Sequence, residues 1–168
     1  MTPRFEKAYN ALVKGFFEGT LAKGTCAACA VGNIVADAQG GVISKIKEPI
    51  HPHCSTKNDF WRHLFCSDAG SQDKRWSKLS NSQYNKLATR LKKLTGYSEA
   101  EMAHIEFTFE TNTRIHHYDY YMRDEQDILE DQYRGLSAVV NVMLKLDSIE
   151  PDPKYAAKFR EHKSLQPA

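Results

Sequence analysis

The chain has 168 residues, of which 41% are hydrophobic and 26% charged, with only 9 Gly and 6 Pro. This composition excludes a disordered or fibrous protein, and the length excludes a TIM barrel, which needs about 250 residues. The 23 basic and 21 acidic residues nearly cancel, to a net charge of +2. No apolar run approaches the ~20 residues that cross a bilayer, and the start lacks a cleavable hydrophobic region. We therefore expect one soluble, cytoplasmic domain over residues 1–168 with no membrane partner.

The first two predicted elements are helices. Apolar residues from Phe5 to Phe17 recur at spacings of three and four, which predicts a helix over residues 3–18 that begins after Thr2 and ends at Gly19. Residues 25–37 are mostly Ala, Cys, Gly and Val. Such small side chains permit close helix packing, so we expect a second helix buried at the centre of the domain and ended by Gly40.

The next part of the chain has weaker patterns. Residues 42–46 are compatible with a short strand, and Pro49 and Pro52 then favour a loop. Thr56 followed by Asp59 is typical of a helix start. Residues 67–73 are polar and predict a mobile linker within the domain.

The C-terminal half again predicts helices. A basic helix is expected over residues 79–94, and Ser98 with Glu101 forms a capping box that begins the next one. Apolar residues alternate with polar ones around Phe107, so the end of that segment is also compatible with extended structure. Residues 124–146 predict the longest helix, and a short one follows Asp152. The expected fold is therefore mainly α, with six or seven helices and at most one short strand or hairpin.

All four cysteines lie within one 41-residue window that also contains three histidines. Cys-x-x-Cys spacing can direct two sulfurs to one point, and loop ligands can complete a tetrahedron, so this region is a candidate zinc site. An iron–sulfur cluster is less favoured because it would take all four thiolates. The candidate ligands are Cys26, Cys29, Cys54, Cys66, His51 and His53.

Two other interpretations of these cysteines remain. Free Cys is among the most buried residue types, so Cys26 and Cys29 also suit a tight helix interface. A thioredoxin-like redox role is weaker, because no strand is predicted before the motif.

Charge is polarised along the sequence. Residues 74–98 carry seven basic residues and no acidic one, which leaves a net charge of −5 on the rest, much of it between Asp124 and Asp131. The basic stretch is interpreted as a solvated helix face, as a surface that pairs with the acidic stretch of the same chain, or as a surface for nucleic acid or an acidic protein. On the second interpretation the contact residues are Lys86, Arg90, Lys92 and Lys93, with Trp76, Tyr84 and Tyr97 as rings for base stacking.

An enzymatic alternative rests on acidic and histidine residues of the C-terminal half. Glu101 and His104 have the Glu-x-x-His spacing of di-iron bundles, but the other instance, Glu48 with His51, contains a proline. The alternative is a small metal-dependent hydrolase that uses Glu101, His104, Asp127 and Asp131. The run of histidines and tyrosines over residues 116–121 is interpreted as a surface loop in preference to a polar cleft with Glu125 and Glu130. No Gly-rich phosphate loop, Gly-x-Ser-x-Gly elbow or His-Glu-x-x-His helix is present.

Three strings resemble one family. Residues 5–13 (FEKAYNALV), 24–35 (GTCAACAVGNIV) and 128–133 (ILEDQY) are similar to small uncharacterised proteins of bacteria and their phages. The resemblance implies a mobile-element or phage setting and assigns no residue a role. From the residues themselves we expect a non-enzymatic accessory or regulatory binding module, and an apolar patch on the longest helix would allow a homodimer.

Overall fold

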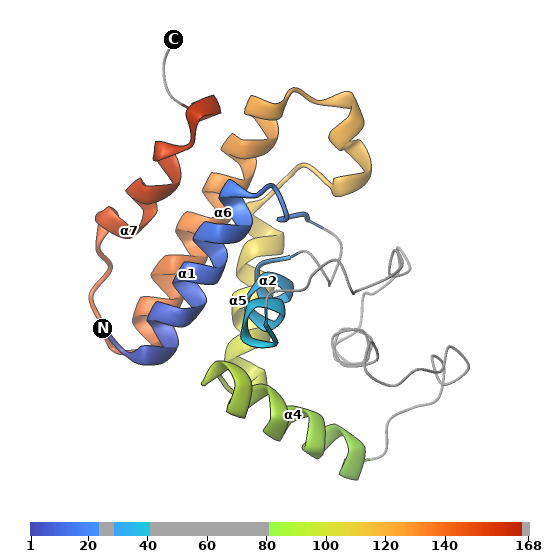
Figure 1. Cartoon of the computed structure of the whole chain (residues 1–168), viewed down its shortest axis with the longest axis vertical. Coiled ribbons are helices and arrows are strands. Elements are labelled where there is room, and N and C mark those ends of the chain that lie inside the picture. Colours follow the sequence, from blue (N-terminus) through green and yellow to red (C-terminus); the bar gives the residue numbers. More distant parts are fainter. Residues whose placement is uncertain (24–28, 41–80, 166–168) are drawn as a thin grey trace.

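A computed structural model describes residues 1–23, 29–40 and 81–165 (Figure 1). These residues form six α-helices and three short 3-10 helices, with no strand among them, which confirms the mainly helical prediction. The α-helices are α1 (Pro3–Phe17), α2 (Ala30–Ala38), α4 (Asn81–Thr95), α5 (Glu99–Asn112), α6 (Glu125–Leu146) and α7 (Pro153–Ala157). The 3-10 helices are η3 (His117–Met122), η4 (Lys158–Glu161) and η5 (Lys163–Leu165).

Helix starts follow the capping residues. The Thr2 side chain accepts a hydrogen bond from the Phe5 backbone N–H at the start of α1. Ser98 and Glu101 form the complete capping box of α5. In α5, Ile105 and Phe109 are fully buried, whereas Phe107 is 67% exposed. The end of this segment is therefore helical, and the extended alternative is wrong.

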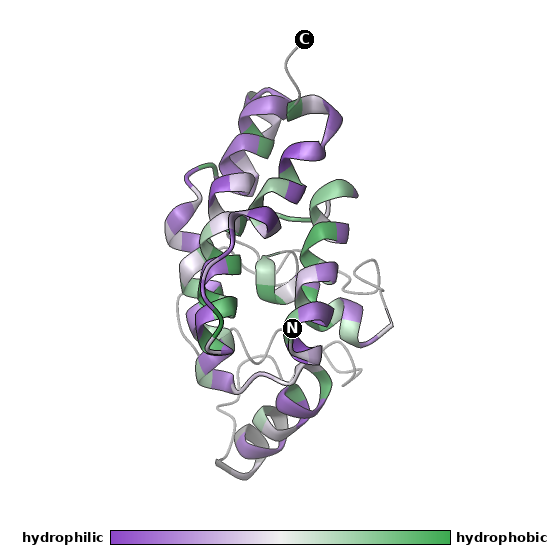
Figure 2. Ribbon diagram, turned by 90° about the vertical axis from the view of Figure 1, so that its left-hand side faces the viewer, coloured by the Kyte–Doolittle hydropathy of each residue, from purple (hydrophilic) through white to green (hydrophobic). Residues whose placement is uncertain are grey.

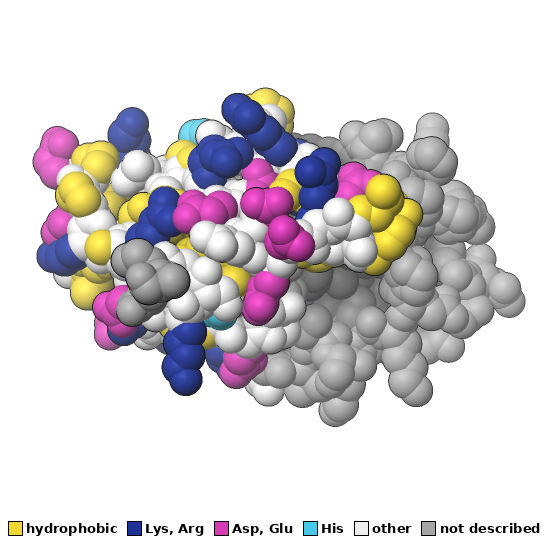
Figure 3. All heavy atoms as spheres, turned by 90° about the horizontal axis from the view of Figure 1, so that it is seen from above, with side chains coloured by type: hydrophobic (Ala, Val, Ile, Leu, Met, Phe, Trp, Pro, Cys, Tyr) yellow, Lys and Arg dark blue, Asp and Glu magenta, His cyan; other side chains and the backbone are white. Residues whose placement is uncertain are grey.

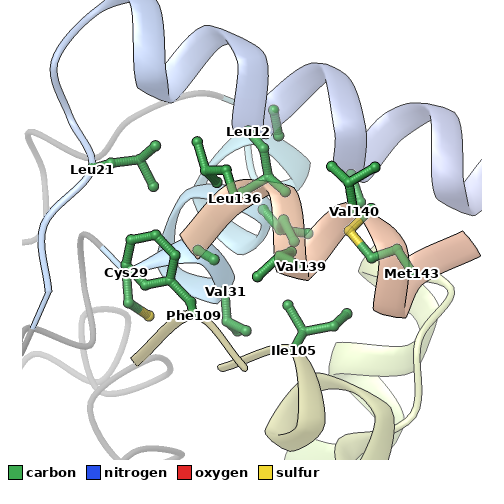
Figure 4. Packing of buried hydrophobic residues seen from close by; sticks show 14 of the residues in the cluster. Leu12, Leu21, Cys29, Val31, Ile105, Phe109, Leu136, Val139, Val140 and Met143 are labelled. Carbon is green, nitrogen blue, oxygen red and sulfur yellow. The ribbon is translucent and has the colours of Figure 1, made fainter. Parts of the chain in front are cut away.

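The core surrounds α6. Helix α5 packs along it, and α1, α7 and η5 also contact it. Figure 4 shows Leu136, Val139, Val140 and Met143 of α6 directed toward Leu12 of α1 and Ile105 and Phe109 of α5. Burial of each such side chain stabilises the fold by about 1.5–3 kcal/mol. In Figure 2 hydrophobic and hydrophilic residues alternate along the helices, as one-sided burial requires.

Helix α2 lies inside the domain, as its small residues predict. It contacts α1, α4 and α5, and residues 30–36 are all buried. Its Asn33 accepts a hydrogen bond from the Thr20 hydroxyl at 2.7 Å. A Cβ atom at Gly15 would lie only 2.4 Å from the Asn33 side-chain oxygen. Glycine at position 15 therefore lets α1 approach α2 closely.

Arg4 joins four segments at one end of the molecule. Its guanidinium pairs with Glu101 at 3.0 Å and Asp147 at 2.5 Å. It also donates to the carbonyls of Gly96 and Leu146. The first turn of α1 is thereby tied to the α4–α5 turn, the start of α5 and the end of α6.

A second polar cluster closes the opposite end of α5. The Lys23 ammonium donates to the carbonyls of Glu110 and Thr113, where the negative end of the α5 dipole lies. The buried carboxylate of Asp131 accepts hydrogen bonds from the backbone N–H groups of Arg114 and Ile115 at 2.8–2.9 Å. These contacts fix the connection that leads through η3 into α6.

Aromatic side chains attach the C-terminal segment to α1. Tyr9 donates a hydrogen bond to the Tyr155 carbonyl at 2.9 Å, and the two rings meet edge to face. Phe159 packs against Tyr9 and Phe16 in the same way. The predicted short last helix is thus present, as α7 continued by η4.

Several predicted features lie outside the described residues. They are the strand at 42–46, the helix start at Thr56, the linker at 67–73 and the start of the Cys-rich helix before residue 29. Within the described part, no helix combines the length and apolar character needed to cross a membrane.

Candidate functional site

The cationic side chains of α4 share one face of that helix. Lys86, Arg90 and Lys93 follow at intervals of four and three residues, so they lie along one side of it. Leu91, on the opposite side, is fully buried and anchors α4 to the domain. Lys92 is exposed and lies beside this row. Ser82, Asn85 and Thr89 follow the same spacing along α4. We name this surface the cationic face, and it consists of Ser82, Asn85, Lys86, Thr89, Arg90 and Lys93.

An open depression of about 700 Å³ lies against the cationic face. Its described lining consists of Ser82, Asn85, Lys86, Thr89, Arg90 and Lys93. Hydroxyl, amide and cationic donors of α4 therefore line one side of this volume, a combination that suits phosphate or carboxylate oxygens. Ser82, Asn85 and Thr89 were not predicted as part of this surface, although the sequence shows their helical spacing from the basic residues.

The positive charge of α4 is not neutralised by the acidic stretch at the start of α6. Within the described residues, Lys86, Lys92 and Lys93 form no ion pair. Helix α4 contacts α1, α2 and α5, whereas Asp124 and Asp131 lie at the far end of α5 (Figure 1). With 14 residues, α5 separates the two groups by about 20 Å. Lys86, Lys92 and Lys93 therefore do not pair with these acids.

The aromatic residues predicted to assist α4 differ in their outcome. Tyr97 is fully buried, and the Arg4 guanidinium lies 4.5 Å from its ring centre. It cannot stack on a base, so this part of the prediction is corrected. Trp76 and the side chain of Tyr84 lie outside the described residues.

One predicted zinc ligand can be placed. Cys29 is buried at the start of α2, and its sulfur accepts a hydrogen bond from the Gly32 N–H at 3.4 Å. Figure 4 shows it beside Phe109 at the edge of the core. The other candidates, Cys26, His51, His53, Cys54 and Cys66, lie outside the described residues. Among residues 1–23, 29–40 and 81–165, no group of three His, Cys, Asp or Glu side chains could hold a metal ion.

Two of the four predicted hydrolase residues lie at the start of α5. Glu101 accepts a hydrogen bond from the Ser98 N–H at 2.6 Å and pairs with Arg4. Its partial burial favours a higher pKa, but the bonds from Ser98 and Arg4 outweigh burial and hold the pKa below its usual value. His104 is exposed one turn further along.

The other two hydrolase residues lie near the start of α6. Asp127 is exposed, and buried Asp131 already accepts three N–H groups, two from the backbone and one from Arg134 at 3.1 Å. Most of the length of α5 separates this pair from Glu101 and His104. The structure therefore does not bring the four residues into one site, and it uses Glu101 and Asp131 to hold the fold together.

The run over residues 116–121 forms η3 and its N-cap. The His117 ring contacts the Lys23 carbonyl at 2.8 Å, and Tyr120 accepts a hydrogen bond from the Gln132 amide at 3.0 Å. Glu130 pairs with Arg160 instead of facing these side chains. The run is thus a surface segment anchored from inside, as its preferred interpretation predicts.

Comparison with known proteins identifies no relative: no family model, curated protein or solved structure matches the chain. The function must therefore be argued from the chemistry of the described surface.

Proposed function

We propose that this chain is a non-enzymatic binding module that holds the phosphate backbone of a nucleic acid on the cationic face of α4. The proposal rests on one observation: a row of basic side chains, interleaved with hydroxyl and amide donors, lines an open depression. When lysine side chains contact phosphates, the counterions condensed on the nucleic acid are released. This release supplies most of the affinity in sequence-independent binding.

The chemistry of the cationic face favours backbone contact over base recognition. Lys86 and Lys93 carry mobile point charges, and Ser82, Asn85 and Thr89 add short polar donors. Phosphate contacts of this kind position a nucleic acid without selecting its sequence. We therefore expect similar affinity for oligonucleotides of different sequence.

The test is a salt titration of the full chain with a fluorescent 20-base-pair duplex of mixed sequence, read by anisotropy. One phosphate contact for each of the three basic residues of the cationic face predicts that log K falls with log salt with a slope of about −2.7. Lys86→Glu with Lys93→Glu removes two of these contacts, so the slope should become about two units shallower and affinity at low salt should fall at least tenfold.

Lys7→Glu with Lys163→Glu is the matched control, because both lysines are exposed and lie outside α4. This variant makes the same change in net charge and should bind within about twofold of the wild type. Equal loss in the two variants, or binding that does not respond to salt, would contradict the proposal. Salt-dependent binding of an acidic peptide, with none of the duplex, would assign the cationic face to an acidic protein instead.

A further inference from the structure

The 3-10 helix η3 exposes an unusual amount of apolar surface. Tyr121 is 84% exposed, Met122 is 69% exposed and Tyr118 is 44% exposed. Exposed acids surround them, namely Asp119, Asp124, Glu125 and Asp127, with Arg123 as the one basic residue in residues 117–127. We call this surface the tip patch. Figure 3 looks down on this end of the molecule, where hydrophobic, acidic and basic side chains share the surface.

The charges of the tip patch are not neutralised by ion pairs within the described residues. Its four acids form no ion pair there, and Asp124 at the N-cap of α6 makes no capping hydrogen bond with its side chain. The patch therefore presents a net charge of about −3 around two side chains, Tyr and Met, that are enriched in protein interfaces.

The backbone beneath the tip patch is held in place from inside. The Lys23 carbonyl accepts hydrogen bonds from the His117 N–H at 3.1 Å and contacts the His117 ring at 2.8 Å. The Tyr120 hydroxyl bonds to Gln132 and to the Lys23 N–H. Tyr121 and Met122 thus project from a fixed segment, which lowers the entropy lost when they bind.

The same chain carries a surface that complements the tip patch. The cationic face has basic side chains along one side of an open depression, whereas the patch has an exposed tyrosine with exposed acids close to it in the sequence. A lysine ammonium can also lie over a tyrosine ring, which adds a cation–π contact. The two surfaces lie at opposite ends of the described fold, so they cannot meet within one molecule (Figure 1).

We propose that the tip patch of one chain docks on the cationic face of a second copy. Contact between two different surfaces is head-to-tail, so it produces open chains of molecules and not a closed pair. Nucleic acid and a second copy then compete for the same helix. The inference shares α4 with the proposed function but stands on the tip patch, and each can fail without the other.

The test combines two variants that each lack one surface. The tip variant carries Tyr121→Ser and Met122→Ser, and the face variant carries Lys86→Glu and Lys93→Glu. At low salt and about 200 µM, the wild type should sediment with an average mass that rises with concentration, and about 0.5 M salt should return it to a monomer. Each variant alone should remain monomeric, with a thermal midpoint close to that of the wild type, since all four side chains are exposed or line the open depression.

The decisive measurement is the mixture of both variants. Head-to-tail docking predicts a 1:1 complex of two chains and nothing larger, because the intact face of one variant accepts the intact tip of the other and both remaining ends are inactive. The tip variant should also bind the duplex as the wild type does, which separates this inference from the proposed function.

Three results would overturn the inference. They are a wild type that stays monomeric, a tip variant that still associates, and a mixture that stays unpaired. A monomeric wild type that binds a lysine-rich peptide through Tyr121 would assign the tip patch to a different basic chain.

Discussion

The surroundings of Glu106 on α5 disfavour the ionised form of its carboxyl group. Burial raises its pKa to about 7, and the Glu110 carboxylate one turn away adds to the shift. Because the folded-state pKa lies above the ordinary value of 4.5, the folded chain binds this proton more tightly than the unfolded chain. The resulting stability is complete below about pH 4.5 and is lost as the pH rises through about 7.

Glu106→Gln should therefore stabilise the protein at pH 8 and leave its stability at pH 4.5 unchanged. One pKa unit corresponds to about 1.36 kcal/mol, and because the side chain is partly exposed we expect a gain of about 1–2 kcal/mol at pH 8. Urea unfolding at both pH values measures it. Glu150→Gln, at an exposed position after α6, is the matched control. A gain of equal size at both pH values would show that ionisation of Glu106 is not the cause.

Of the six predicted zinc ligands, Cys29 is the one that lies within the described residues. Its sulfur lies at the start of α2 and accepts a hydrogen bond from the Gly32 N–H, and metal would bind it as a thiolate. The hypothesis predicts about one zinc per chain in protein purified without chelator, and loss of that zinc in Cys29→Ser.

Elemental analysis for zinc and iron, with thermal unfolding before and after chelation, tests the zinc hypothesis. Chelator should lower the midpoint of the wild type and leave that of Cys29→Ser unchanged. Substoichiometric metal, with no response to chelator, would leave Cys29 as a buried core cysteine.

At the scale of elements, Asp131 decides how α5 is connected to α6. Its carboxylate satisfies two backbone N–H groups of the connection and the Arg134 side chain. Asp131→Ala leaves these buried donors without an acceptor, so the free energy of unfolding should fall by about 2–4 kcal/mol in a denaturant titration.

Asp127→Ala, one turn earlier and exposed, should change the free energy of unfolding by at most about 0.5 kcal/mol. Equal effects of the two changes would show that the carboxylate of Asp131 does not hold the connection.

Helix bounds were predictable because their signals are local. Thr2, Ser98 and Asp124 precede helices within one or two residues of the predicted starts. The roles of Arg4 and Asp131 were not predictable in this way. Arg4 binds partners up to 143 residues away, and Asp131 binds backbone groups, which carry no sequence signal. The separation of the four candidate hydrolase residues was not predictable for the same reason, because the sequence does not show that the two pairs lie near opposite ends of α5.

At the scale of the whole molecule, the helical packing preserves the charge asymmetry of the sequence. Residues 81–98 contribute four basic side chains and no acidic one at one end, whereas η3 and the start of α6 place acids at the other. The basic residues of the cationic face were predicted correctly as a helical group. The separation of these residues from the acids was not predicted. It depends on the turn at Gly96 between α4 and α5, where the φ of 80° suits glycine.

Within the described residues, this separation is an electric dipole, positive at α4 and negative at η3 and the start of α6. A polyanion nearby exerts a torque on such a dipole and rotates the protein so that α4 arrives first. At physiological ionic strength the field decays over about 8 Å, so the rotation is confined to the last moments of approach. Charge asymmetry would then act on how often an encounter succeeds, and dilution of the buffer would accelerate association.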